Sequence, residues 1–215
     1  MSYLHLFFLL LFFPHVALTQ VRPNPFDEPA PPEQEILKDV AAAAARYANA
    51  IGCDVGLLSE KTVASLSPWA KKMDRDSAEY AVLWNGKIGC DAGNFNGGTH
   101  IAIVRIGEGD TFVVDPTASS PIVSIDVPAS YVERITESGN TWFVAEGTAH
   151  TPKDARCCPS AKVRFTLSKT RGNHWIHNNL CLIEEVQPRP STMTDAPICS
   201  PAKKMATKAR QKNPE

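Results

Sequence analysis

The six cysteines are the residues of this 215-residue chain whose chemistry is most constrained by their spacing. None is separated from another by two residues, the spacing typical of a thiolate metal site, and adjacent cysteines chelate one ion poorly. An even number of cysteines in an exported chain is typical of disulfides. We therefore expect all six to be oxidised: Cys53, Cys90, Cys157, Cys158, Cys181 and Cys199.

The adjacent pair Cys157-Cys158 limits which disulfides can form. A bond within this pair would distort the peptide that joins the two residues, so the sequence predicts a distant partner for each. We expect these partners to be Cys53 and Cys90, in an order that the sequence leaves open. Cys181 would then bond to Cys199. Each such bond would stabilise the fold by about 2–4 kcal/mol, mainly by restricting the unfolded chain.

Two histidines in the segment His174-Trp-Ile-His177 have a spacing that could hold a metal ion. On a helix, side chains three residues apart share a face and could bind one ion together. We assign this segment to a strand, where the same spacing places the two rings on opposite faces. No metal ion or other cofactor is therefore predicted.

One segment of the chain suggests an enzymatic alternative. It runs from Thr99-His100-Ile101-Ala102 to Val114-Asp115-Pro116. This stretch resembles the His-strand-turn-strand-Asp segment of the transglutaminase-like, papain-related cysteine hydrolases. The resemblance implies that Asp115 orients His100, and that His100 holds the thiolate of Cys53 for attack on an acyl group. An oxidised cysteine cannot be that nucleophile. We assign no enzymatic activity, and a hydrolase using Cys53, His100 and Asp115 remains the alternative.

A second resemblance covers about residues 78–178. This region contains Ile88-Gly89-Cys90, Phe112-Val113-Val114-Asp115-Pro116 and Cys157-Cys158-Pro159-Ser160. With these elements the chain is similar to a mostly uncharacterised group of exported bacterial proteins, and Cys-Cys-Pro-Ser is the most specific of them. The resemblance implies a periplasmic or secreted setting and no particular activity.

The first residues also indicate export. An apolar run from Leu4 to Phe13 precedes Ala17-Leu18-Thr19, which predicts a signal peptide over residues 1–19. The run is too short to cross a bilayer core, so the mature protein is not expected to be an integral membrane protein. The absence of Lys and Arg from Met1-Ser2-Tyr3 weakens the prediction of export, and an uncleaved N-terminal anchor is the alternative, because the apolar run is near the lower limit of spanning length.

Composition divides the rest of the chain into three parts. Residues 20–32 are rich in proline and predict an extended linker, and residues 33–185 are long enough for a single globular domain. Residues 186–215 combine prolines with lysines and predict a basic, flexible tail. Docking of this tail on an anionic polymer or a membrane surface is the alternative.

The domain begins with the clearest helical pattern in the chain. Ile36, Val40, Ala44 and other apolar residues recur at helical spacing, which predicts a helix over residues 33–51. Residues 59–66 fit a short helix and a strand equally well.

From Glu79 onward, aromatic and β-branched runs alternate with turn residues, which predicts antiparallel strands joined by hairpins. The predicted turns lie at Asn85-Gly86, 107–110, 138–140 and 171–173. The expected fold class is therefore α+β, with the 33–51 helix packed on an antiparallel β-meander and stabilised by disulfides.

Charge and loop composition bear on function. The net charge of −1 and the pI near 6.6 give no electrostatic reason to expect a nucleic acid partner. The glycine-rich loop 89–98 allows close approach of a ligand, and its candidate contact residues are Asp91, Asn94, Phe95 and Asn96. We expect an exported binding or interaction module whose partner is an unknown protein, peptide or envelope polymer. An ordinary long hairpin loop is the alternative for this segment.

Overall fold

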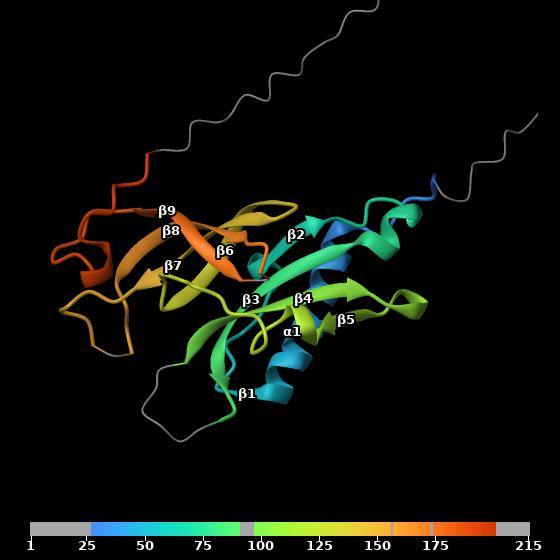
Figure 1. Ribbon diagram of the computed structural model, residues 1–215, viewed down its shortest axis with the longest axis horizontal. Helices are drawn as coiled ribbons and strands as arrows, with labels where there is room; N and C mark the ends of the chain where they lie inside the picture. The colour runs from blue at the N-terminus through green and yellow to red at the C-terminus, as the bar shows by residue number, and fades with distance from the viewer. Residues whose placement is uncertain (1–26, 91–96, 156, 173, 201–215) are drawn as a thin grey trace, which may run out of the picture.

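The computed structural model describes residues 27–90, 97–155, 157–172 and 174–200, and in these residues it has the mixed α+β architecture that the sequence indicates. Helix α1, Glu33–Ile51, is followed by strands that form two antiparallel sheets. In Figure 1 the first sheet, β1–β5, lies in front of α1, and the second sheet, β6–β9, lies beside it.

Helix α1 coincides with the predicted helix. Its buried residues include Ile36, Val40, Ala44 and Ala48, which share one face at helical spacing. The acidic residues of its first turn stabilise the helix, because they lie near the positive end of its dipole. The helix is therefore fixed by its apolar face against the first sheet rather than by propensity alone.

Strands β3, Glu79–Ile88, and β4, Gly98–Ile106, form the centre of the first sheet. Strand β5, Phe112–Asp115, pairs with the edge of β4 that faces away from β3. Two short strands pair with the edge of β3 that faces away from β4. Strand β1, Gly52–Cys53, pairs with the C-terminal end of β3, and β2, Val63–Ser67, pairs with its N-terminal end. Residues 59–66, for which the sequence favoured neither a helix nor a strand, contain a 3-10 turn, Glu60–Thr62, that leads into β2.

The second sheet is a meander whose strands follow one another in sequence order. The strands are β6 Tyr131–Gly139, β7 Trp142–Ala149, β8 Ala161–Lys169 and β9 Trp175–Leu182. The connections between β6 and β7 and between β8 and β9 lie at predicted turns, whereas the connection between β7 and β8 was not predicted. The expected single meander is therefore corrected to two sheets, and α1 packs on the first of them.

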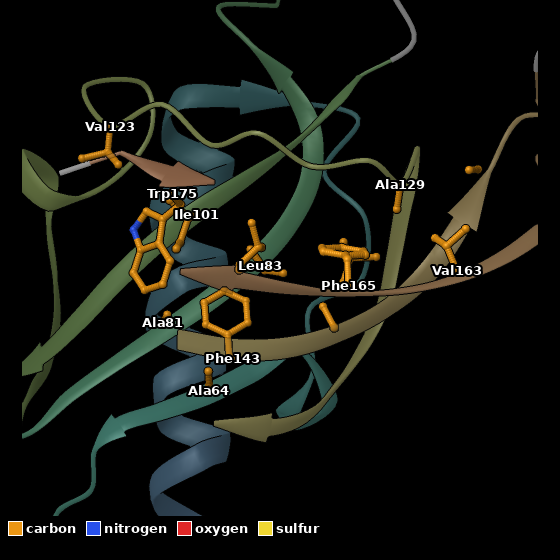
Figure 2. Packing of buried hydrophobic residues seen from close by; sticks show 14 of the residues in the cluster. Ala64, Ala81, Leu83, Ile101, Val123, Ala129, Phe143, Val163, Phe165 and Trp175 are labelled. Carbon is orange, nitrogen blue, oxygen red and sulfur yellow. The ribbon is translucent and has the colours of Figure 1, made fainter. Parts of the chain in front are cut away.

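Two hydrophobic cores lie on opposite faces of the β3–β4 pair. Leu83 and Ile101 face the second sheet, where they meet Phe143, Phe165 and Trp175 (Figure 2). On the other face, Val82, Trp84, Ala102 and Val104 pack against α1. Adjacent residues of β3 thus serve different cores, because successive side chains of a strand point to opposite faces. The result is three layers, in the order helix, sheet, sheet.

The predicted turn at Asn85-Gly86 is wrong, because β3 continues through these residues to Ile88. Gly86 pairs with Gly98 across the ladder. A Cβ at Gly86 would lie 2.8 Å from Cζ3 of Trp84, so this glycine makes room for the indole ring. Asn85 accepts a hydrogen bond from Thr99 Oγ1 at 2.9 Å, which ties it to β4.

Two buried serines complete the edge of β4. The ladder between β4 and β5 ends at the Ile103–Asp115 pair, which leaves backbone N–H groups of β4 to be satisfied elsewhere. Ser119 Oγ accepts from Ile103 N at 2.8 Å, and Ser120 Oγ accepts from Ile101 N at 3.2 Å. The two serine hydroxyls thus accept the hydrogen bonds that the carbonyl groups of a neighbouring strand would otherwise accept.

The proline-rich segments at both ends of the domain belong to the fold where the structure describes them. Met193, only 2% exposed, is part of the core between the sheets, so the predicted flexible tail is corrected for residues 186–200. At the other end, Lys72 N donates to Glu28 O at 2.9 Å, and Ala30 N donates to Ala70 O at 3.2 Å. Residues 28–30 of the predicted linker therefore pair with the chain. The predicted signal peptide, the first part of the linker and residues 201–215 lie outside the described residues.

A buried carboxylate ties together three strands of the second sheet. Glu146 on β7 is 3% exposed and accepts from Arg164 Nε at 2.8 Å and from Arg134 Nε at 2.7 Å. Burial alone would raise the pKa of Glu146, but the hydrogen bonds and charges of Arg164 and Arg134 together lower it below the usual value for a glutamate. The ionised form is thus the one that the folded state favours.

We expect Glu146→Gln to destabilise the domain by about 3 kcal/mol at neutral pH, because it removes one partner from a buried charge network. The folded pKa of Glu146 lies below its unfolded value, so its stabilising contribution is present above the unfolded pKa. That contribution is lost as the pH falls through the folded pKa. Urea unfolding across the acid range should show the gap between the two proteins closing below about pH 5.

The matched control is Glu133→Gln, which removes an exposed carboxylate 2.5 Å from Lys162 Nζ. Its effect should stay below about 1 kcal/mol. Equal effects of the two substitutions would show that Glu146 does not hold the sheet together.

Candidate functional site

One of the three disulfides matches the expected set, and the other two differ from it. Cys181 bonds to Cys199, as predicted, with a Cα–Cα distance of 5.0 Å. Cys53 bonds to Cys90, with a Cα–Cα distance of 5.1 Å, and neither bonds to the Cys157-Cys158 pair. The reason is local: β1 pairs Cys53 with Lys87 of β3, and Gly89 N donates to Ile51 O, so the chain returns Cys90 to the side of Cys53.

Cys157 and Cys158 bond to each other, which corrects the expectation of distant partners. Both residues are exposed on the connection between β7 and β8. With Cys53 and Cys90 already joined, no free sulfur remains for them among the described cysteines. Asp154 organises the same connection, since its carboxylate accepts from Thr151 N at 2.7 Å and from Ser160 N at 2.9 Å.

The structure does not bring Cys53, His100 and Asp115 together as a hydrolase would require. Cys53 is oxidised. His100 Nε2 lies 3.1 Å from Gly86 O, and its ring stacks at a tilt on Trp84 with centroids 4.5 Å apart. Burial lowers the pKa of His100, which the contact with Gly86 O only partly opposes, so the ring is neutral at physiological pH.

Asp115 is committed to a different local role. Its carboxylate accepts from Thr117 Oγ1 at 2.6 Å and from Thr117 N at 3.0 Å, which caps the 3-10 turn Pro116–Ala118. These contacts, the hydroxyl one first, lower the pKa of Asp115. Its partner across the ladder is Ile103, three residues along β4 from His100. The two residues therefore form no orienting pair.

His174 and His177 contact the segment that lies beside the start of β9. His174 Nδ1 is 2.5 Å from Ser124 Oγ, and His177 Nδ1 is 2.9 Å from Asp126 Oδ2. The two rings thus lie next to different residues, although His177 Nδ1 makes no hydrogen bond with the described residues. Within the described residues, no group of three or more His, Cys, Asp or Glu side chains is arranged to hold a metal ion.

The predicted contact residues Asp91, Asn94, Phe95 and Asn96 lie outside the described residues. The chain next to them borders an open hollow of about 340 Å³. Its lining includes Gly97, Gly98, Thr99, Asp126, Tyr131 and His150.

Two further hollows adjoin the start of α1, with volumes of about 550 and 210 Å³. Pro31, Trp69 and Asp110 line both, and we call the two together the Trp69 cleft. The remaining lining residues are Glu28, Pro29, Ala30, Lys72 and Arg75 in the larger hollow, and Glu35, Ile36, Asp39 and Phe112 in the smaller.

Backbone hydrogen bonds hold the walls of the Trp69 cleft in place. The N–H of Trp69 donates to the hydroxyl of Tyr80, which is buried on β3, at 2.8 Å. The wall formed by Glu28 and Ala30 is pinned to residues 70–72 by the two backbone bonds described above. The cleft is therefore largely preformed, as ligand sites usually are.

The rim of the cleft is charged and predominantly acidic. Lys72 Nζ pairs with Glu28 at 2.9 Å, and Arg75 Nε pairs with Asp110 at 2.5 Å. Glu35 and Asp39 are exposed on α1 and form no ion pair with the part of the chain that the structure describes. Four carboxylates thus face two cations, and both cations are already paired.

The indole N–H of Trp69 is buried without a hydrogen-bond partner among the described residues. Trp69 as a whole is 7% exposed. Trp84 and Trp175 also have unpartnered indole N–H groups, but of these three tryptophans only Trp69 lines the cleft. A buried donor without an acceptor destabilises the folded state by about 1–3 kcal/mol. An acceptor from a ligand would recover this free energy at Trp69.

The sequence analysis missed Trp69 and the role of Glu35 and Asp39. Trp69 follows Pro68 outside any periodic run, and only its isolation as a large aromatic residue could have drawn attention to it. The two carboxylates read as ordinary solvent-facing residues of a helix, because their relation to Trp69 depends on tertiary packing.

Comparison with protein-family models, with curated proteins and with solved structures found no significant match to this chain. Across the described residues, no helix combines the length and the apolar character that crossing a membrane requires.

Peptide mapping of the oxidised protein should recover three linked pairs: Cys53 with Cys90, Cys157 with Cys158, and Cys181 with Cys199. Alkylation before reduction should label none of them. Replacing Cys181 and Cys199 together by Ser should destabilise the domain by about 3 kcal/mol, the loop-entropy estimate for their separation of 18 residues. A free, rapidly alkylated Cys53 whose labelling falls in His100→Ala would instead support the hydrolase.

Proposed function

We propose that the protein is an exported binding module and that the Trp69 cleft is its ligand site. The observation that carries the proposal is the buried, unpartnered indole N–H of Trp69 on the wall of a large hollow. An acceptor supplied by a ligand would recover the hydrogen bond that the folded chain leaves unmade. The partner is a protein, a peptide or an envelope polymer.

The shape and chemistry of the cleft support this proposal. Its larger hollow of about 550 Å³ lies within the range of known ligand pockets. Pro29, Ala30 and Pro31 supply apolar surface, while the paired charges of Lys72 and Arg75 surround it. Apolar surface with a few polar groups is typical of ligand-binding sites.

Export is supported by the three disulfides, which form and persist in oxidising compartments. The periplasm and the extracellular space both meet this condition. The predicted signal peptide is the sequence feature that agrees with it.

Binding must involve a small movement at the cleft wall. The Nε1 atom of Trp69 has almost no accessible surface, so an acceptor reaches it only when a covering side chain moves aside. Lys72, whose side chain is 57% exposed, lines the larger hollow together with Trp69.

We expect a ligand to shift the indole N–H signal of Trp69 in ¹H–¹⁵N NMR spectra while those of Trp84 and Trp175 stay in place. The panel to titrate contains short peptides and neutral and anionic oligosaccharides, and Trp69→Phe assigns the signal. The same substitution should weaken binding about fivefold to tenfold, because it removes the donor and keeps an aromatic ring.

Trp142→Phe is the matched control, since Trp142 is exposed on the second sheet, away from the cleft. Binding that is insensitive to Trp69→Phe but lost in Trp142→Phe would place the ligand site on the second sheet and overturn the proposal. Thermal unfolding of Trp69→Phe should stay close to that of the wild type, because the lost packing is offset by removal of an unpaired donor.

A further inference from the structure

The geometry points to a short extended peptide with a lysine or arginine side chain as the ligand of the Trp69 cleft. This inference rests on the proposed function, since it names the ligand class of the same site. Two independent observations carry it: a donor that lacks an acceptor and a pair of carboxylates that lack a cation.

Glu35 and Asp39 are the carboxylates that lack a cation. They lie four residues apart on α1, so their side chains are neighbours on one face of the helix. Both line the smaller hollow, and neither forms an ion pair with a described residue. The other two carboxylates of the cleft, Glu28 and Asp110, already have Lys72 and Arg75 as partners. Positive charge is therefore missing at the α1 end of the cleft and nowhere else on its rim.

The apolar residues of the smaller hollow suit the stem of a basic side chain. Pro31, Ile36 and Phe112 line it together with the two carboxylates. Lys and Arg bury their methylene groups on apolar surface while the charged head reaches a polar group. A basic side chain from the ligand would thus lie along Phe112 and end between Glu35 and Asp39.

A peptide also supplies the acceptor that Trp69 lacks. Trp69 lines both hollows, so a peptide whose basic side chain occupies the smaller one runs past Trp69 with its backbone. Once the movement of the cleft wall described above exposes Nε1, a backbone carbonyl of the peptide accepts from the indole N–H. A neutral oligosaccharide would leave the two carboxylates without a cation, and an anionic polymer would be repelled by them.

The test uses two synthetic peptides that differ at one side chain, acetyl-Ala-Ala-Lys-Ala-Ala-amide and the same peptide with norleucine in place of lysine. Norleucine keeps the methylene stem and lacks the charge. We expect the lysine peptide to shift the Trp69 indole signal of the full chain and to bind about three- to tenfold more tightly than the norleucine peptide. This preference should shrink as the salt concentration rises.

The variant Glu35→Gln/Asp39→Asn should abolish the preference for the lysine peptide over the norleucine peptide. Its charge-matched control is Glu60→Gln/Glu137→Gln, which removes two exposed carboxylates that do not line the cleft. The control should bind both peptides as the wild type does. An equal loss in the two variants would show a general charge effect and overturn the inference.

The outcomes separate the ligand class from the proposed function. If an oligosaccharide or the norleucine peptide shifts the Trp69 signal and the lysine peptide gains nothing, the inference is wrong and the cleft remains a ligand site. If no member of either panel moves the Trp69 signal, both the inference and the proposed function fail.

Discussion

The pairing of β3 with β4 places apolar side chains on both faces of the same hairpin, and each face can be buried only by a separate layer. Leu83 and Ile101 need the second sheet, whereas Val82 and Ala102 need α1. Their side chains are almost wholly shielded from water, so either layer alone would leave one face exposed. The three-layer order of the protein follows from this requirement.

The candidate site depends on the same arrangement. Burial against β3 and β4 fixes α1, and with it the carboxylates of Glu35 and Asp39. Tyr80, in the same core, holds the backbone of Trp69 through its hydroxyl. The packed core thus positions the cleft, and the charged side chains of the cleft lie on its exposed rim.

Local patterns predicted those features that depend on periodicity. In β8, Val163, Phe165 and Leu167 are buried and alternate with partly exposed polar residues, and β-branched and aromatic runs of this kind predicted the strands from Glu79 onward. The unbroken apolar run 80–84 is typical of a strand buried on both faces, yet it does not say what covers each face, so the second sheet was missed. Asn85-Gly86 has turn composition, but the glycine is required by the ring of Trp84. The cleft depends on contacts between distant segments and left no periodic signal.

A crystal structure of the protein with the lysine peptide tests the central claim most directly. The account expects a peptide carbonyl within about 3.2 Å of Trp69 Nε1 and the lysine ammonium within about 4 Å of Glu35 or Asp39. A peptide bound beside Gly97 or on the outer face of the second sheet, with the indole N–H of Trp69 still unpartnered, would contradict it.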